Sequence, residues 1–312
     1  MERFDQINDF TSTKGTVLTI GTFDGVHIGH QKIIEQVVQI ATKEHLYSCL
    51  LTFSPHPREV LQKDTNIKLL TTQEEKADRL QSLGLQSMVV HPFSKEFSRL
   101  TAREYVEDVL VSKLKVKHLI VGYDHRFGRN READIVDLNY FAKRFDFKVT
   151  EIEAQDINDV AVSSTKIRTA LSEGVVHKAN QYLGYHYGIS GTVSRGKGLG
   201  KTLGFPTANL EQIDPKKLLP ANGVYIISAN LDGKSVEGMM NIGINPTVNQ
   251  GGLHAEVHLL DFDSDLYNRR ISVSFHKRIR SEKRFESLEA LSAQLKEDKS
   301  MTLKYFKEGL LS

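Results

Sequence analysis

Two histidines three residues apart, His27 and His30, lie in a turn-rich segment that is suited to phosphoryl chemistry. An apolar run over residues 16–20 precedes them, and apolar residues recur at helical spacing after them. The pair therefore lies where a strand passes into the N-terminus of a helix, and backbone N–H groups and the helix dipole attract phosphate there. Two imidazoles at such a point can stabilise the charge that grows on a transferring phosphoryl group.

Three more segments of the first half carry groups that can bind a nucleotide. His56 and Pro57 follow the second predicted strand at the same sheet edge as His27, which favours a role in lining the nucleotide or acceptor pocket. A later loop offers the carboxylate of Asp124 for a ribose or a metal and the ring of Phe127 for stacking. Residues 162–168, VSSTKIR, indicate a helix start at which hydroxyls cap the backbone and basic side chains reach phosphate oxygens. A non-functional interpretation stays open for each segment. The first can be only a stiff loop, the second a charged surface loop, and the third a plain helix N-cap.

The second half holds a glycine-rich stretch, 196–204, that continues into a segment with oxygen-bearing side chains. Thr207 and Asn209 are two residues apart, so both can face one side of an extended segment, and such hard ligands suit Mg²⁺. Glu256 lies in an alternating strand pattern at 253–262. A carboxylate on such a strand is usually solvated, but one that faces a site can accept the proton of an attacking alcohol.

The elements that must position the first group of residues alternate between strand-like and helix-like segments. This alternation predicts a doubly wound parallel sheet with helices on both faces. Ligands of such sheets bind beyond the carboxyl ends of the strands, where the histidine segment falls. We expect strands at 16–21, 47–53, 87–93, 118–123 and 147–152, and helices near 30–45, 72–83, 101–113 and 134–145.

After a helical stretch around 163–184 the pattern changes to short strands. Asp232-Gly233 predicts a two-residue hairpin, and a helix is expected from residue 287. The pattern predicts an antiparallel Greek-key-type β-barrel with a C-terminal helix. We therefore expect two domains, 1–185 and 186–312. The barrel strands are expected at 189–193, 223–231, 236–242, 253–262 and 270–275.

Composition limits the partners of the chain. Its 312 residues carry a net charge of only +2, which argues against a tight nucleic-acid-binding protein. The single cysteine, Cys49, excludes an internal disulfide and a cysteine-based zinc site. The sequence shows neither the apolar core of a signal peptide nor a run that could span a bilayer. We expect a reduced, cytoplasmic protein with no nucleic-acid or membrane partner.

Six motifs, in this order, resemble those of the bifunctional bacterial riboflavin kinase/FMN adenylyltransferases (FAD synthetases), over essentially the whole chain. The first is also similar to the signature of nucleotidylyltransferases, and the second to the motif with which that superfamily grips the β- and γ-phosphates of ATP. The motifs are GTFDGVHIGH at 21–30, VSSTKIR at 162–168, LGFPTANL at 203–210, GVY at 223–225, NIGINPTV at 241–248 and EVHLLDF at 256–262.

The resemblance implies two reactions, both with ATP and Mg²⁺: phosphorylation of riboflavin in the C-terminal barrel and adenylylation of FMN to FAD in the N-terminal domain. It implies that His27 and His30 contact ATP phosphates, that Thr207 and Asn209 hold Mg²⁺, and that Glu256 is the kinase base. The residues expected to bind ATP or phosphate are Gly21, Phe23, Asp24, Gly29, Ser164, Thr165, Arg168, Gly198, Lys201 and Thr207. The flavin or acceptor pocket is expected at His56, Pro57, Asp124 and Phe127.

Three other interpretations compete. A fragment of a class I aminoacyl-tRNA synthetase would share the histidine motif, but it would need a larger catalytic domain and a basic tRNA-binding region. A non-catalytic flavin-binding regulator on the same fold would be supported by loss of the phosphate-site residues, which are all present. An enzyme that retains only one of the two activities stays open.

Overall fold

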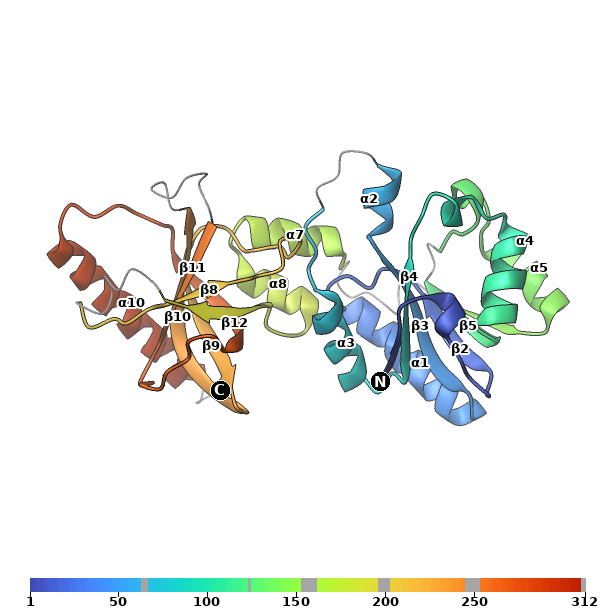
Figure 1. Ribbon diagram of the computed structural model, residues 1–312, viewed down its shortest axis with the longest axis horizontal. Coiled ribbons are helices and arrows are strands. Elements are labelled where there is room, and N and C mark those ends of the chain that lie inside the picture. The colour runs from blue at the N-terminus through green and yellow to red at the C-terminus, as the bar shows by residue number, and fades with distance from the viewer. Residues whose placement is uncertain (63–66, 123–124, 153–161, 196–202, 245–252, 310–312) are drawn as a thin grey trace. The chain divides into compact units, whose positions relative to one another are not determined.

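The chain forms two compact units, Met1–Ser164 and Thr165–Ser312 (Figure 1). The computed structural model describes residues 1–62, 67–122, 125–152, 162–195, 203–244 and 253–309. Helix α8 (Val176–Leu183) and nearly all of α7 (Ser164–Ser172) fall within the second unit. The functional boundary that the sequence places after residue 185 stays a prediction.

The first unit is built on a six-stranded parallel sheet in the order β1-β4-β3-β2-β5-β6. All five predicted strands are present, each within two residues of its expected limits, so the predicted fold class is confirmed for this unit. The additional strand, β1, extends one edge of the sheet. The strands are β1 (Glu2–Phe4), β2 (Thr16–Ile20), β3 (Tyr47–Ser54), β4 (Ser87–Pro92), β5 (Val116–Gly122) and β6 (Lys148–Ile152).

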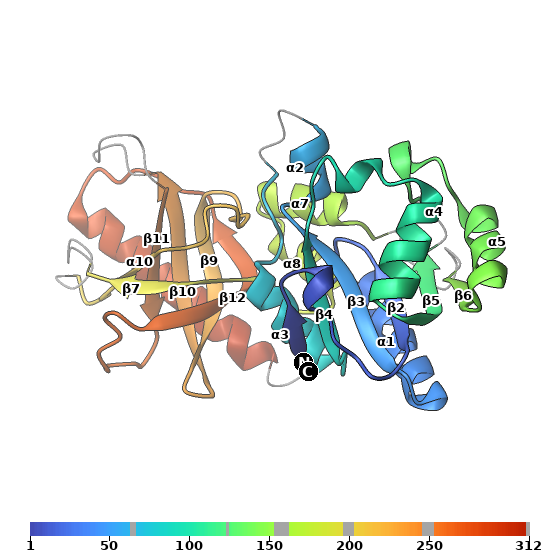
Figure 2. The same cartoon turned by 45° about the vertical axis from the view of Figure 1, so that its right-hand side comes forward.

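Helices cover both faces of this sheet (Figure 2). Successive side chains of a strand point to opposite faces, and each face carries its own apolar cluster. Val17 packs with residues of α1 and α3, whereas its neighbour Leu18 packs with residues of η3 and α5. The predicted helix at 101–113 begins as α4 and continues as the π-helix η3. The helices are η1 (Ile7–Asp9), α1 (Ile28–Glu44), α2 (Pro57–Leu61), α3 (Gln73–Ser82), η2 (Phe97–Arg99), α4 (Ala102–Glu104), η3 (Tyr105–Lys113), η4 (Arg129–Arg131) and α5 (Ile135–Phe145).

The second unit contains a closed antiparallel barrel with the strand order β10-β11-β8-β7-β12-β9, and this confirms the predicted barrel. The predicted hairpin is present: Leu231 pairs with Lys234 across Asp232 and Gly233, which both have positive φ. Strand β8 was not expected from the sequence. The strands are β7 (Gly188–Ser194), β8 (Ala208–Glu211), β9 (Gly223–Leu231), β10 (Lys234–Ile244), β11 (Leu253–Leu259) and β12 (Arg270–Arg280).

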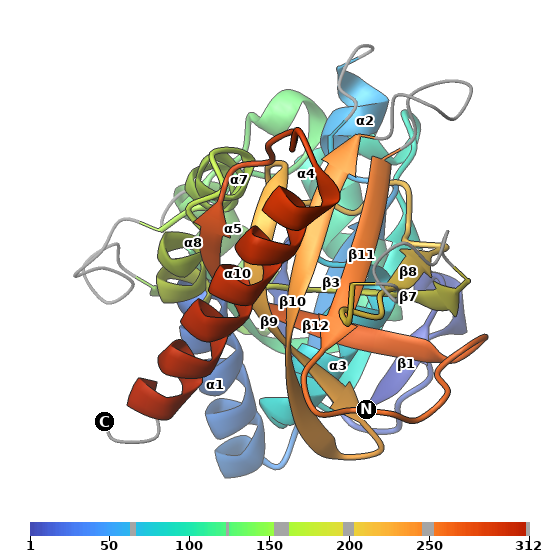
Figure 3. The same cartoon turned by 90° about the vertical axis from the view of Figure 1, so that its left-hand side faces the viewer.

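The C-terminal helix α10 (Leu288–Gly309) lies against the outside of the barrel, along β10 (Figure 3). The interior of the barrel is filled by apolar side chains, among them the fully buried Tyr225 and Phe275. Their rings pack edge to face with centroids 5.3 Å apart. The outer face is therefore the one that can present polar side chains.

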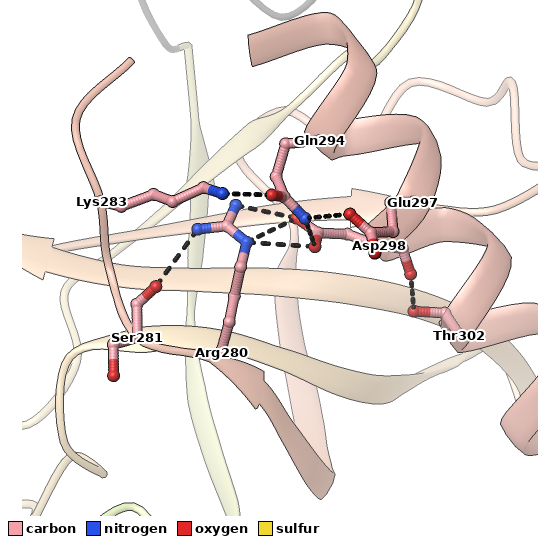
Figure 4. Close-up of polar contacts among 7 residues, drawn as sticks. All are labelled: Arg280, Ser281, Lys283, Gln294, Glu297, Asp298 and Thr302. Carbon is pink, nitrogen blue, oxygen red and sulfur yellow. Dashed lines mark hydrogen bonds and ion pairs between the residues drawn. The ribbon is translucent and has the colours of Figure 1, made fainter. Parts of the chain in front are cut away.

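A buried ion pair fastens α10 to the end of β12 (Figure 4). The Arg280 guanidinium donates through Nε to both oxygens of Asp298 at 3.1 Å and through Nη2 to Oδ2 at 2.8 Å. The Asp298 side chain is 0% exposed, and it also accepts from the amide of Gln294 at 3.0 Å. The Lys283 ammonium donates to the oxygen of the same Gln294 amide. The segment between β12 and α10 is thereby attached to the helix.

We predict that Arg280→Met lowers the free energy of unfolding of the second unit by about 3–5 kcal/mol, because it leaves the Asp298 carboxylate buried without its ion partner. Urea-induced unfolding, followed by circular dichroism and by hydrogen exchange of α10, measures this loss. The control is Arg269→Met, which breaks the exposed ion pair with Asp232 and should leave the transition in place. An equal effect of both substitutions would show that burial of Asp298 does not govern the stability.

Candidate functional site

The two histidines stand at the carboxyl end of strand β2, where the chain turns into α1. His27 is the N-cap of α1, and its Nδ1 accepts a hydrogen bond from the backbone N–H of His30 at 3.4 Å. The two rings stack with centroids 3.6 Å apart, and the ring of Phe23 lies 4.5 Å from that of His30. A Cβ at Gly21 would lie 3.0 Å from the Phe23 ring, so glycine lets this ring approach the backbone.

The backbone of this turn is strained. Phe23 and Val26 have φ angles of 46° and 37°, in the left-handed region that side chains with a Cβ, and β-branched ones above all, rarely adopt. Such conformations cost on the order of 1–3 kcal/mol each and persist only when their surroundings hold them. The turn that carries the histidines therefore depends on contacts from other parts of the unit.

Asp24 supplies the main contact. Its side chain is buried, and its carboxylate accepts hydrogen bonds from the backbone N–H groups of Leu70 and Thr71 at 3.0 and 3.1 Å. In return, the N–H of Gly25 donates to the Thr71 hydroxyl at 3.1 Å, and the Ser164 hydroxyl donates to the Asp24 carbonyl at 3.0 Å. Asp24 and Ser164 thus fix the turn. The contacts with ATP that the sequence predicts for them stay predictions.

Burial keeps the histidines uncharged. It lowers the pKa of His27 to about 4, against the opposing influence of the Asp24 carboxylate. It also lowers the pKa of His30 well below its usual range, and the nearby His27 and Lys76 act in the same direction. The Nδ1 atom of His30 is buried and has no hydrogen-bond partner among the residues that the structure describes. Two neutral imidazoles beside a helix N-terminus can donate N–H groups to an anion without a positive charge of their own.

The residues predicted for a flavin pocket have structural partners of their own. His56 is the N-cap of α2, where its Nδ1 accepts from the N–H two residues on at 3.2 Å, and Pro57 occupies the first helical position. Phe127 is buried in the core, with its ring centroid 6.0 Å from that of Tyr105. Asp124 lies outside the described residues. Their roles toward the flavin stay predictions.

Three more residues predicted for the triphosphate lie in the first turns of two helices. Gly29 is buried in the first turn of α1, beside the histidines. Thr165 is exposed and Arg168 is half-buried, and both belong to the first turns of α7 in the second unit. Gly198 and Lys201 lie outside the described residues.

A second cluster of predicted residues comes together on the outer face of the barrel. Strand register places Asn209 of β8 directly opposite Glu256 of β11, and Glu256 directly opposite Asn241 of β10. Ser194 of β7 is opposite Asn209. We call these four residues, Ser194, Asn209, Glu256 and Asn241, the outer row. Directly paired residues of antiparallel strands project to the same face, and the sequence neighbours of Glu256 are buried in the barrel. Glu256 is half-buried rather than fully solvated.

The outer row contains residues that sequence reasoning missed. Asn241 is the first residue of the motif at 241–248, but the sequence analysis assigned it no role. That motif was the signal that could have identified it. His254 lies two residues before Glu256, with its Nε2 3.4 Å from the Asn241 amide nitrogen, and its buried Nδ1 has no hydrogen-bond partner within the described part of the chain. The Ser194 hydroxyl is also buried, and none of the described residues forms a hydrogen bond with it. Strand alternation puts His254 on the same face as Glu256, whereas Asn241 and Ser194 come to that face only through the pairing of strands that are distant in the sequence.

Oxygen-bearing side chains in and beside the outer row are the candidate ligands for a metal ion. Within the described residues no group of three or more histidine, cysteine, aspartate or glutamate side chains could hold a metal ion. Thr207 is half-buried and lies two residues before Asn209, so that both can face the same side. The hydroxyl oxygen of Thr207 and the amide oxygen of Asn209 fit a Mg²⁺ that substrate phosphates help to bind.

Comparisons with known proteins match both units. A family model described as FAD synthetase matches residues 9–166, and one described as riboflavin kinase matches residues 183–306. A protein named bifunctional riboflavin kinase/FMN adenylyltransferase from Listeria monocytogenes is 38% identical over 292 residues, 93% of this chain and 92% of its own length. A protein of the same name from Escherichia coli K12 is 38% identical over 294 residues, 94% and 93% of the two chains.

The fold also matches a solved structure. A Streptococcus pneumoniae protein whose structure is titled a macrolide-efflux protein aligns with a TM-score of 0.88 and 28% identity, over 96% of this chain and 98% of its own. In the part of the chain that the structure describes, no helix is both long enough and apolar enough to cross a membrane.

We predict that His27 and His30 stay neutral down to well below pH 6. Because burial depresses both pKa values, the folded state resists protons that the unfolded state binds below about pH 6.5, and stability should fall as pH drops from there. NMR titration of ring-labelled protein, with free histidine as the internal reference, measures this. Ring signals of His27 and His30 that titrated together with the reference would contradict the buried, neutral pair.

Proposed function

The chain belongs to the family of bifunctional riboflavin kinase/FMN adenylyltransferases, and from that premise we propose that it makes FAD in two steps. The second unit transfers the terminal phosphoryl group of ATP to riboflavin, which gives FMN and ADP. The first unit transfers AMP from a second ATP to FMN, which gives FAD and pyrophosphate. The observation that carries the proposal is the presence of two separate groups of phosphate-chemistry residues, one in each unit.

The two activities are assigned to residues 1–185 and 186–312. The family models support this division, since one ends at residue 166 and the other begins at residue 183. Helices α7 and α8 then belong to the adenylyltransferase in function. Thr165 and Arg168 then remain, as the sequence predicts, candidate ligands of the triphosphate.

In adenylyl transfer an FMN phosphate oxygen forms a bond to the α-phosphorus of ATP, and the bond from this phosphorus to the bridging oxygen breaks. Both the nucleophile and the leaving pyrophosphate are anions, so the step needs no general base. What it needs is stabilisation of the charge on the α-phosphate oxygens and in-line alignment of the reactants. The stacked, neutral His27 and His30 can donate N–H groups there, next to the N–H groups that begin α1.

In the kinase step the terminal ribityl hydroxyl of riboflavin forms a bond to the γ-phosphorus of ATP, and ADP leaves. Here a proton must be removed from an alcohol, and the Glu256 carboxylate is the acceptor that the outer row offers. Asn209 and Asn241 flank Glu256 through strand register and can orient it and the phosphates. The hydrogen bonds between the paired strands β8, β11 and β10 hold this row of side chains in place.

Mg²⁺ fits the outer row, where Thr207 and Asn209 would hold it together with the phosphates of ATP. Bound there, it would neutralise charge on the β- and γ-phosphates and so make the γ-phosphorus easier to attack.

The proposal has two further parts. One is a flavin pocket at His56, Pro57, Asp124 and Phe127, and the other is a cytoplasmic location of the protein. The family supports riboflavin, FMN and ATP as the small-molecule partners.

We predict that the two activities can be lost one at a time. His30→Ala removes an oriented donor and should slow FAD formation from FMN by about 10²–10³-fold, without affecting riboflavin phosphorylation. Glu256→Gln keeps the shape of the side chain but cannot take a proton, and it should slow FMN formation by about 10²–10⁴-fold without affecting FAD formation from supplied FMN. Chromatographic separation of riboflavin, FMN and FAD measures both rates in one assay.

Each variant serves as the folding control of the other, because each should retain one full activity. Loss of both activities in a folded variant would rule out two independent sites. Parental protein that makes FMN but no FAD, or uses FMN without making it, would show that only one activity is retained. A Glu256→Gln variant with the parental kinase rate would exclude Glu256 as the base.

A further inference from the structure

Lys76 of α3 is a buried cation that the two reactions described above do not use. Its side chain is 4% exposed, and its Nζ donates a hydrogen bond to the backbone carbonyl of Thr22 at 2.7 Å. The Thr52 hydroxyl of β3 lies 3.4 Å from the same Nζ. An ammonium group removed from water costs several kcal/mol unless it is compensated, so a lysine at this position calls for a role.

The carbonyl that Lys76 holds begins the strained part of the histidine turn. Thr22 directly precedes Phe23, the first residue with positive φ, and the Thr52 hydroxyl donates to the same carbonyl at 3.2 Å. Asp24 fixes the middle of the turn through Leu70 and Thr71. Lys76 therefore fixes its start, and the Phe23 ring that follows is the one that packs on His30.

The contacts of Lys76 and Asp24 belong to one continuous clamp. Thr71, which binds Asp24, is followed by Thr72, the N-cap of α3. Thr72 forms a capping box with Glu75: the N–H of Glu75 donates to the Thr72 hydroxyl at 3.2 Å, and the N–H of Thr72 donates to the Glu75 carboxylate at 3.0 Å. The box fixes the first turn of α3, and Lys76 comes directly after it.

Two charged groups act on Lys76 from the elements around it, and Lys76 in turn acts on His30. Burial lowers its pKa to about 8, while the Asp24 carboxylate of the turn raises it and the Arg3 guanidinium of β1 lowers it. Its own charge helps to keep His30 of α1 neutral. At neutral pH the ammonium is therefore charged, but it is close enough to deprotonation for pH to act on it.

We propose that Lys76 is a positioning residue for adenylyl transfer: its ammonium anchors the Thr22 carbonyl and thereby fixes the Phe23–His30–His27 ring stack against the helix N-terminus. It touches no reacting atom and acts through the turn. The proposal rests on the assignment of FMN adenylylation to the first unit. A displacement of catalytic groups by about 1 Å is enough to cost on the order of a hundredfold in rate, so loss of this anchor should be visible in kcat.

Two substitutions separate the hydrogen bond of Lys76 from its charge. Lys76→Met keeps the length and apolar body of the side chain and removes both, and it should lower kcat for FAD formation about ten- to a hundredfold with a smaller change in KM. Lys76→Gln keeps an N–H donor without charge and should retain more of kcat. The matched control, Lys143→Met, makes the same exchange at an exposed site on α5 and should match the parent.

The pH profile gives a readout that a merely structural lysine would not move. In the parent, FAD formation should decline as pH rises through about 8, because the ammonium loses its charge and a charge-assisted bond weakens. Neither Lys76→Met nor Lys76→Gln can titrate, so both should lack this decline. Riboflavin phosphorylation in the second unit should be equal in all four proteins, and circular dichroism reports that the first unit of each is folded.

The outcomes distinguish the inference from the function on which it rests. A parent that makes no FAD from FMN and ATP overturns the proposed function itself. A parent that makes FAD, together with folded Met and Gln variants that keep its kcat and its alkaline decline, overturns the role of Lys76. If Lys76→Met fails to fold, the Gln variant decides through the same two measurements.

Discussion

The buried carboxylate of Asp24 is the interaction on which the first site depends. The turn that carries the histidines contains two residues with a Cβ in left-handed conformations, and an isolated chain would not stay in that shape. Asp24 compensates by accepting backbone N–H groups from the loop before α3, and Thr71 returns a bond to Gly25. A rigid turn then presents the imidazoles at the start of α1, so strain in the backbone becomes preorganisation of the site.

The second site uses a different device. Its polar side chains come from four strands and are aligned by register, so a slip of one residue would turn Glu256 into the barrel and Ala255 out of it. The apolar interior prevents that slip, because it would bury a carboxylate without a partner. Arg280 and Asp298 then hold the C-terminal helix against the outside of the same barrel. One site is therefore held by a loop clamp and the other by the core of a barrel.

Much of the fold could be predicted because its signal is local. Apolar runs separated by helical periods identified the central strands, and Asp232-Gly233 identified the hairpin. Strand β1 was missed because three residues, two of them charged, carry no strand pattern, and β8 was missed because its Asn209 and Glu211 are polar.

The site could be predicted less fully, because its contacts are not local. The histidines and Glu256 are marked by motifs, but the partners of Asp24 lie 46 and 47 residues away in the chain. No spacing rule connects Lys76 to Thr22, and none shows that Phe127 is buried rather than open to a ligand. Tertiary packing decides which side chains hold the backbone in place and which are left to bind a substrate. The motifs thus located the chemistry without showing what supports it.

The most direct test of this account is the rate of FAD formation from FMN and ATP in Asp24→Asn, measured beside riboflavin phosphorylation in the same protein. The amide keeps the size of the side chain but replaces one acceptor oxygen with a donor, so the loop at Leu70 and Thr71 loses part of its hold on the turn. The account predicts at least a tenfold loss in FAD formation and an unchanged kinase rate. FAD formation at the parental rate, or an equal loss of both activities in a folded variant, would contradict it.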